Sequence, residues 1–187
     1  MRMIVLVYLG LLIGACQVPD GPDKEHPLYV PDPNRLFFLN TRQLDYSLVV
    51  DDADSGCRVY LSDGLNGEDS DIRAYLLDYW IAGQAGLILE VVTPNGRGQI
   101  EDKRDLEQTL ASVETEVFEV SDSPNNMVFG SDLIANAANA EALFGVVMQG
   151  KDINLSGPVS SSVVLNAEDP AYRQLRVVLN DYLKLIR

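Results

Sequence analysis

The folded part of the chain opens with three short apolar segments that have the length of strands. Residues 36–39 and 44–50 predict two strands around a short turn, and the second shows clear alternation of apolar and polar positions. Residues 57–61 predict a third strand, which follows a turn rich in aspartate.

Apolar side chains at helical spacing predict a helix in the next segment. The recurring positions are Ile72, Tyr75, Leu76, Tyr79 and Trp80. Asp69 or Ser70 would cap this helix and Gly83 would end it. Aromatic residues dominate buried area, so the three aromatic residues of the stripe are interpreted as core rather than as the lining of a ligand groove.

Two further helices are predicted, the second at the C-terminus. Residues 101–113 form a charged helix with Leu106, Leu110 and Val113 facing inward. Asp169 and Pro170 open the C-terminal helix, since proline suits the first helical position. Its apolar stripe is Tyr172, Leu175, Val178, Leu179, Tyr182 and Ile186. Its polar face is Arg173, Gln174, Arg176, Asn180, Asp181 and Lys184.

The remaining segments predict mostly strands. Residues 87–93, 115–120 and 159–165 have the composition of strands. Residues 131–149 are ambiguous, because Ser131 can cap a helix while the last part of the segment fits either a helix end or a strand.

Together these elements predict an α+β fold. We expect a mixed, largely antiparallel sheet with packed helices and a C-terminal amphipathic helix, and an α/β fold is the alternative. The length of 187 residues is close to that of one domain, and neither an internal repeat nor a linker follows residue 34. Residues 35–187 are therefore predicted to form a single globular domain.

The first sixteen residues have the features of an export signal. Arg2 precedes a short apolar run, and small residues precede Cys16. The run is shorter than the ~20 apolar residues that span a bilayer. An ordinary signal peptide, or a short buried helix that contains a cysteine, is the alternative interpretation.

The segment Ile13-Gly14-Ala15-Cys16 resembles the lipobox of bacterial lipoproteins. The resemblance implies that residues 1–15 are a cleaved signal peptide and that Cys16 becomes the lipid-bearing first residue. It implies diacylglycerol on the Cys16 sulfur and usually a third acyl chain, such as palmitate, on its nitrogen; several chains anchor durably. Gln17, which is not the aspartate that retains lipoproteins in the inner membrane, implies the outer membrane. A Gram-positive host would leave the protein on the outside of its only membrane.

Residues 16–34 are predicted to be the lipidated cysteine and a proline-rich tether. Five of the nine prolines lie here, and proline disfavours regular helix and favours extended chain. The tether would hold the domain away from the membrane surface.

The charge of the chain argues against a nucleic-acid partner. There are 28 acidic and 14 basic residues, for a formal net charge of −14, and loss of Arg2 with the signal makes the mature chain more negative still. A field of this sign repels phosphate groups, and no run of lysine and arginine opposes it. The acidity is interpreted as a means of keeping a periplasmic or surface protein soluble.

Cys57 is the second of two cysteines and is predicted to be buried. With Cys16 lipidated it has no partner for a disulfide within the chain. It shares a strand face with Val59 and Leu61, as a small hydrophobic residue would.

A calcium site is considered because acids are dense between residues 51 and 71. Asp52, Asp54 and Asp63 are weak candidate ligands, since alternate oxygen ligands before a glycine resemble the start of a calcium loop. The match fails in detail: Gly56 comes one position early, and the twelfth position holds aspartate rather than glutamate. Solvated turn aspartates are the favoured interpretation, so no metal and no cofactor are predicted.

Catalytic signatures are missing from the sequence of the predicted domain. The only histidine, His26, lies in the tether, and the three serines at 160–162 have no base to activate them. Pairs of carboxylates are available, but their spacing in sequence does not give the separation that glycoside hydrolysis requires.

Two functions follow from these observations. The first is a membrane-anchored envelope lipoprotein whose non-catalytic accessory or adaptor domain binds another protein. The alternative is a carboxylate-dependent hydrolase that acts on cell-wall or surface glycan. Two facing carboxylates in a cleft would favour the hydrolase, whereas an exposed apolar patch would favour the adaptor.

Overall fold

A computed structural model describes most of the chain after residue 32. The described residues are 33–66, 71–92, 99–113, 117–120, 126–127, 129, 132–156 and 162–187. The predicted signal peptide, Cys16 and residues 17–32 of the predicted tether lie outside them. None of the described helices has the length and apolar character needed to cross a membrane.

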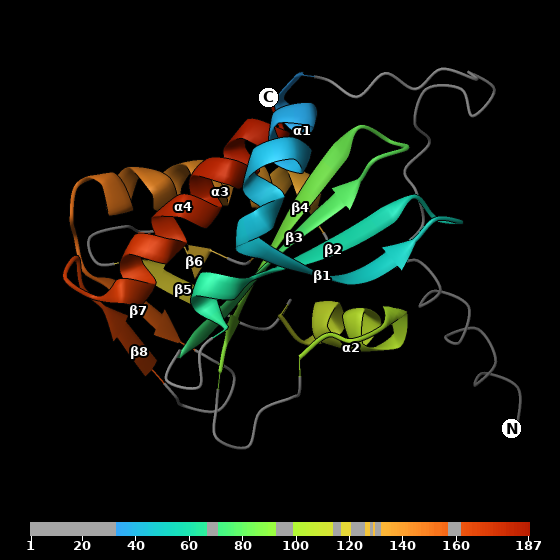
Figure 1. Cartoon of the computed structure of the whole chain (residues 1–187). Coiled ribbons are helices and arrows are strands. Elements are labelled where there is room, and N and C mark those ends of the chain that lie inside the picture. Colours follow the sequence, from blue (N-terminus) through green and yellow to red (C-terminus); the bar gives the residue numbers. More distant parts are fainter. Residues whose placement is uncertain are drawn as a thin grey trace, which may run out of the picture.

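The larger sheet is a four-stranded antiparallel meander (Figure 1). Its strands, in spatial as well as chain order, are β1 (Tyr46–Asp52), β2 (Cys57–Ser62), β3 (Ile72–Tyr79) and β4 (Gln84–Val91). Gly56, at the turn between the first two strands, has a φ of 65°, and a Cβ there would lie 2.4 Å from Ile81. Only glycine therefore fits this turn without strain.

A smaller antiparallel sheet lies beside the first (Figure 1). Its order is β6-β5-β7-β8, and its strands are β5 (Val117–Val120), β6 (Asn126–Met127), β7 (Ile153–Ser156) and β8 (Ser162–Leu165).

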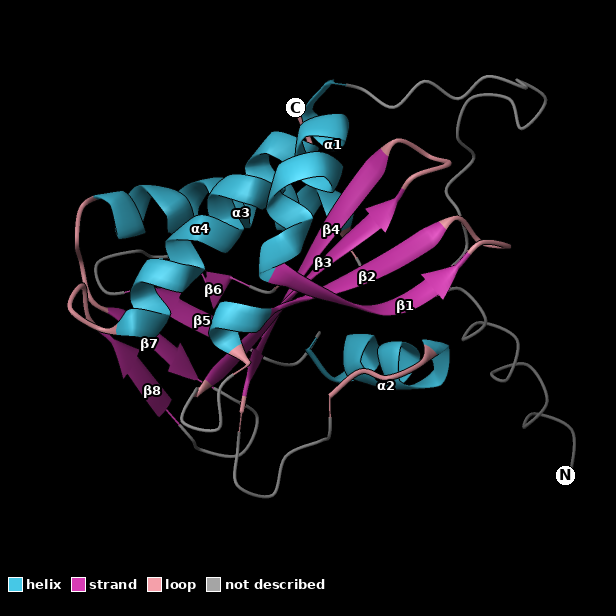
Figure 2. Ribbon diagram, viewed as in Figure 1, coloured by secondary structure: helices cyan, strands magenta, loops and turns pink. Residues whose placement is uncertain are grey.

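The helices lie on both faces of the larger sheet. Helices α3 (Leu133–Met148) and α4 (Pro170–Leu185) cover one face, and α2 (Lys103–Val113) covers the other (Figure 2). The described part of the chain begins with α1 (Pro33–Phe37), a π-helical turn η1 (Phe38–Arg42) and a 3-10 turn η2 (Gln43–Asp45). Helix α1 and η1 pack against α4, and a further 3-10 turn is η3 (Asp63–Leu65).

Two clusters of buried side chains hold these layers together. The larger cluster joins α3 and α4 to one face of the larger sheet and to β7 and β8 of the smaller sheet. The other cluster lies between the opposite face and α2, and it contains Cys57, Val59, Leu61 and Leu106. Burial of the Cys57 thiol is thus confirmed.

The predicted α+β class is confirmed, with one correction to the sheet. The strands form two separate sheets, and every described strand pair is antiparallel, so the single mixed sheet is wrong. The C-terminal amphipathic helix is confirmed, with Pro170 in its first turn.

Two predicted elements have the wrong type. The segment expected to be a helix around Ile72 and Trp80 is strand β3, because both of its faces are buried and the apolar residues therefore form a continuous run. The segment 36–39, expected to be a strand, is helical, because Phe38 faces the core while Leu36 and Phe37 face outward.

The other segments are close to expectation. The ambiguous residues 131–149 contain helix α3, whose N-cap is Asp132, and Ser131 lies outside the described residues. Strand β7 was not predicted. The segments 115–120 and 159–165 are confirmed as strands over their described parts. In α2, Leu106 is buried as expected, whereas the side chains of Leu110 and Val113 lie outside the description.

Candidate functional site

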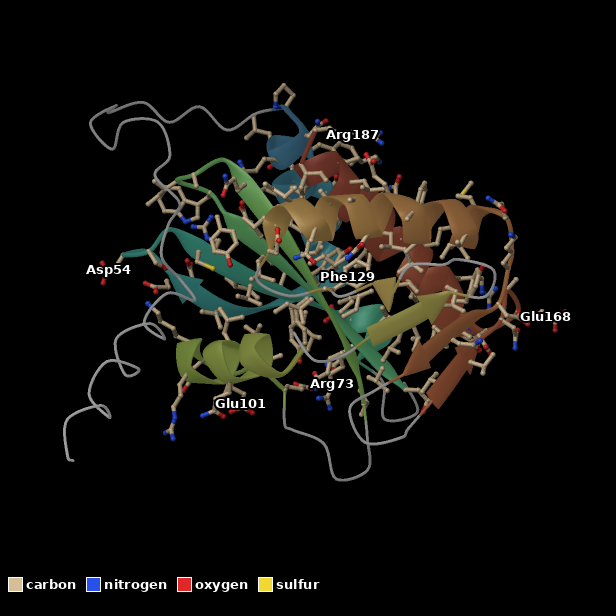
Figure 3. All side chains as sticks on the ribbon, turned by 180° about the vertical axis from the view of Figure 1, so that it is seen from behind. Asp54, Arg73, Glu101, Phe129, Glu168 and Arg187 are labelled. Carbon is tan, nitrogen blue, oxygen red and sulfur yellow. The ribbon has the colours of Figure 1, made fainter. Side chains whose placement is uncertain are left out.

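The structure separates Asp63 from Asp52 and Asp54, the other two aspartates considered as calcium ligands. Asp52 ends β1 opposite Cys57, whereas Asp63 follows Ser62, which pairs with the first residue of β1. A strand of this length puts about 20 Å between the two positions. Figure 3 shows Asp54 at the outer end of the β1–β2 hairpin, pointing away from the body of the molecule.

Asp52 has protein partners in place of a metal. Its Oδ1 accepts hydrogen bonds from the backbone N–H groups of Asp54 and Ser55, and its Oδ2 lies 2.9 Å from Lys103 Nζ. The hydrogen bond from Lys103, followed by those from Ser55, lowers the pKa of Asp52 to about 2. Within the described ranges, no three acidic, histidine or cysteine side chains are grouped as metal ligands would be.

The aromatic residues of β3 belong to the core, as expected. Tyr75 and Tyr79 are buried in the cluster that faces α2. Trp80 is half-buried at the end of the strand, where the Arg58 guanidinium lies 5.6 Å from its ring.

One candidate site is a groove along the outer side of α4. It has a volume of about 480 Å³ and lies where α1, η1 and the last turn of α3 meet α4. We call it the α4 groove. Its lining residues are Phe37, Arg42, Phe144, Met148, Arg176, Val177, Asn180, Asp181 and Lys184.

The periodicity of α4 explains why the groove has a charged side. The apolar stripe of α4 faces the core, so Arg176 and Lys184 on the opposite side remain exposed. Helix α3 ends at Met148 and leaves this side chain 59% exposed. Phe37, at the end of α1, is 49% exposed, and Lys184 Nζ lies 5.5 Å from its ring centroid.

A second hollow, of about 440 Å³, adjoins the α4 groove. Arg42 and Val177 line both hollows. The other lining residues of the second hollow are Leu44, Asp45, Tyr46, Ser62, Asp63, Gly64 and Gln174. Leu44 is 81% exposed, so this hollow adds a further apolar side chain to the same surface.

An ionic network centred on the buried Asp181 lies between the two hollows. Arg42 Nε donates to both carboxylate oxygens of Asp181, at 3.2 and 3.0 Å, and the Tyr46 hydroxyl donates to Asp181 Oδ2 at 3.0 Å. Arg42 Nη1 also lies 2.7 Å from Asp45. Asp181 is only 3% exposed, so its predicted place on the solvent face of the C-terminal helix is wrong.

This network favours the charged form of Arg42 and the neutral form of Tyr46. Burial lowers the pKa of Arg42, but the hydrogen bond and the charge of Asp181 outweigh that effect and raise the pKa above its usual value. Burial, followed by the charge of Asp181, raises the pKa of Tyr46 far above its usual value. Tyr46 therefore stays a neutral donor and Arg42 a cation.

The carboxylates that line the two hollows all have partners. Asp181 is bonded to Arg42 and Tyr46, Asp45 to Arg42, and Asp63 accepts a hydrogen bond from Ser47. This arrangement suits binding, because the exposed groups of the α4 groove are apolar side chains and cations.

The α4 groove is not evident from the sequence. Phe37, Met148 and Lys184 come from three segments that are distant in the chain. The only signal was the polar face predicted for the C-terminal helix, which includes Arg176, Asn180 and Lys184. Comparison with known proteins found no protein-family model, no curated protein and no solved structure that matches this chain.

Proposed function

We propose that this chain is a lipid-anchored envelope protein whose non-catalytic domain binds another protein through the α4 groove. The observation that carries the proposal is the exposure of Phe37 and Met148 together in this groove. Exposed apolar side chains that gather in one hollow are typical of a binding surface, whereas single exposed ones are ordinary. Aromatic residues and methionine are also enriched at protein interfaces.

The anchor in this proposal is a lipid on Cys16, with residues 17–32 as the tether, because helix α1 begins at Pro33, and the outer membrane as the destination. The support is the lipobox-like segment before Cys16 and the glutamine after it. A durable anchor needs more than one acyl chain, which the lipoprotein modification supplies.

The anchor is tested by metabolic labelling with a palmitate analogue. The Cys16→Ser variant loses the label and leaves the outer-membrane fraction, whereas Cys57→Ser, which alters a buried thiol, retains it. Labelling of the Cys16→Ser variant at the wild-type level would refute the anchor.

Protein binding is tested by photocrosslinking in intact cells. A photoreactive residue in place of Met148 lies in the α4 groove, and one in place of Ile134 lies at the other end of α3 with 85% exposure. The two positions are about 21 Å apart along the helix. The expected result is a discrete protein adduct from position 148 and none from position 134. Equal adducts from both positions, or none from position 148, would count against the proposal.

A further inference from the structure

We propose that the α4 groove selects an acidic protein segment that also carries an apolar anchor residue. This inference rests on the proposed function and names the chemistry of the partner. It follows from the charge and from the apolar lining of the groove.

The charge of the groove is opposite to that of the whole chain. The chain has twice as many acidic as basic residues, yet the groove is lined by three cations and a single acid. That acid, Asp181, is buried and bonded to Arg42, so its charge is already balanced. A ligand in the groove therefore meets a local field that favours carboxylates, inside a molecule that repels them elsewhere.

Two of the cations are available to a ligand. Arg42 is engaged by Asp181 and Asp45. Among the described residues, by contrast, neither Arg176 nor Lys184 forms an ion pair with a carboxylate, and both side chains are exposed. They are eight positions apart on α4, or about 12 Å along the helix axis. A segment with two carboxylates at about this separation would match both.

The apolar lining of the groove favours a ligand that carries an apolar anchor residue between its two carboxylates. Phe37 lies next to Lys184, and Phe144 and Met148 belong to the last turn of α3. Methionine adapts its shape to different apolar partners, and an aromatic ring offers a rigid surface. One large apolar side chain, flanked by acids, would fill this part of the groove.

A protein segment fits these observations better than a membrane surface. An anionic bilayer faces the whole domain, whose net charge of −14 would oppose it, whereas a peptide contacts the groove alone. Residues 17–32 of this chain contain acids at Asp20, Asp23, Glu25 and Asp32. Their occupation of the groove is a distinct outcome of the test below.

The test measures peptide binding to the purified full-length mature chain carrying Cys16→Ser, by fluorescence anisotropy. The probes are a twelve-residue peptide of glutamate with one central phenylalanine, the same peptide with lysine for glutamate, and the same peptide with serine for phenylalanine. We expect the first to bind, and the other two to bind about tenfold or more weakly. Binding of the first should weaken as salt is raised.

Matched charge reversals locate the binding. Arg176→Glu/Lys184→Glu should weaken binding of the acidic peptide about tenfold or more. Arg173→Glu/Arg104→Glu changes the net charge equally at two exposed positions outside the groove and should change affinity by about twofold at most.

Several outcomes would overturn the inference: equal weakening by both double variants, preference for the lysine peptide, or binding of none of the three. A protein adduct from position 148 together with any of these would leave the proposed function standing and refute only the acidic partner. If neutralising Asp20, Asp23, Glu25 and Asp32 tightens peptide binding about tenfold, the groove is occupied by the chain's own segment, and the assignment to a separate partner is wrong.

Discussion

Two arginines in the first ten described residues attach this segment to different parts of the fold. Arg35 and Asp78 are each 1% exposed, and Arg35 Nε lies 2.7 Å from Asp78 Oδ1. Arg35 Nη2 also donates to the carbonyl of Gln84 at 3.0 Å. A buried ion pair gains little over well-packed apolar residues, but loss of one partner leaves an uncompensated charge. Removal of Arg35 alone is therefore expected to destabilise the fold.

Arg35→Met should lower the free energy of unfolding by about 3–5 kcal/mol, because Asp78 loses this cation in a buried site. Urea unfolding monitored by circular dichroism measures the change. The double variant Arg35→Met/Asp78→Leu should recover most of the loss. A single variant as stable as the wild type would show that Asp78 does not depend on Arg35.

The Asp52 carboxylate should titrate with a pKa of about 2, against an ordinary value of 3.8, and Lys103→Met should raise it toward that ordinary value. Because the pKa is lowered in the folded state, the stabilisation is complete above pH 3.8 and is lost as the pH falls toward 2. NMR titration of the side-chain carboxyl measures this, with Lys151→Met as the control. A titration unchanged by Lys103→Met would contradict the hydrogen bond.

At the scale of elements, α4 has two roles that its sequence pattern places on opposite sides. Its inward side supplies Leu175, Val178 and Leu179, all fully buried, to the larger cluster. Its outward side supplies the cations of the α4 groove. The fold and the candidate site therefore depend on the same helix, and variants must be chosen to separate the two.

Leu179→Ala should destabilise the protein by about 2–5 kcal/mol, because the side chain is fully buried among α3, α4 and the larger sheet. Arg173→Ala, on the exposed side of the same helix, should change the stability by less than about 0.5 kcal/mol. Thermal unfolding distinguishes the two. An unchanged melting curve for Leu179→Ala would mean that α4 does not contribute to the core.

Whether an element was predicted correctly from the sequence depended on how many of its faces are buried. The C-terminal helix has one buried face, so its period was readable and its position was predicted. Strand β3 is buried on both faces: Leu76 points into one cluster and Leu77 into the other. Its apolar run has no period of two, and a subset of its positions imitated a helix. The cover that α2 gives the second face arises from tertiary structure and is not encoded within the strand.

The candidate site was beyond prediction for a related reason. Phe37 was assigned to a strand, and the segment that ends in Met148 was ambiguous. The groove exists only because α1, α3 and α4 meet. Asp181 shows the same dependence. Burial of its carboxylate is unfavourable unless partners compensate for it, and Arg42 and Tyr46, which are distant in the sequence, supply the hydrogen bonds.

At the scale of the whole molecule, one cluster of buried side chains joins the two sheets. Ile153, Leu155 and Leu165 of the smaller sheet belong to the same cluster as α3, α4 and one face of the larger sheet. Shared burial of this kind couples the unfolding of its parts, so the described fold should unfold as one cooperative unit.

Leu155→Ala, a change in the smaller sheet, tests this coupling when unfolding is followed in the larger sheet. Trp80, the single tryptophan, lies at the end of β3 and reports on the larger sheet. Its fluorescence and the far-ultraviolet circular dichroism should lose their native signals in one transition, with the midpoint lowered equally in both. A fluorescence midpoint that stays at its wild-type value, with an earlier dichroism step, would show that the sheets unfold separately.

The two arginine attachments at the start of the fold also have a mechanical consequence. Helix α1 begins beside the C-terminus (Figure 1), so a pull on the chain ahead of Pro33 would enter the molecule at the end where the chain finishes. Arg35 would pass that force to β3 and β4, and Arg42 would pass it to α4. Because the two attachments lead into different layers, the force would be shared between them instead of peeling α1 away first. Strands β7 and β8 lie on the side of the molecule away from this point (Figure 1), so a tether attached here would leave them directed away from its anchor.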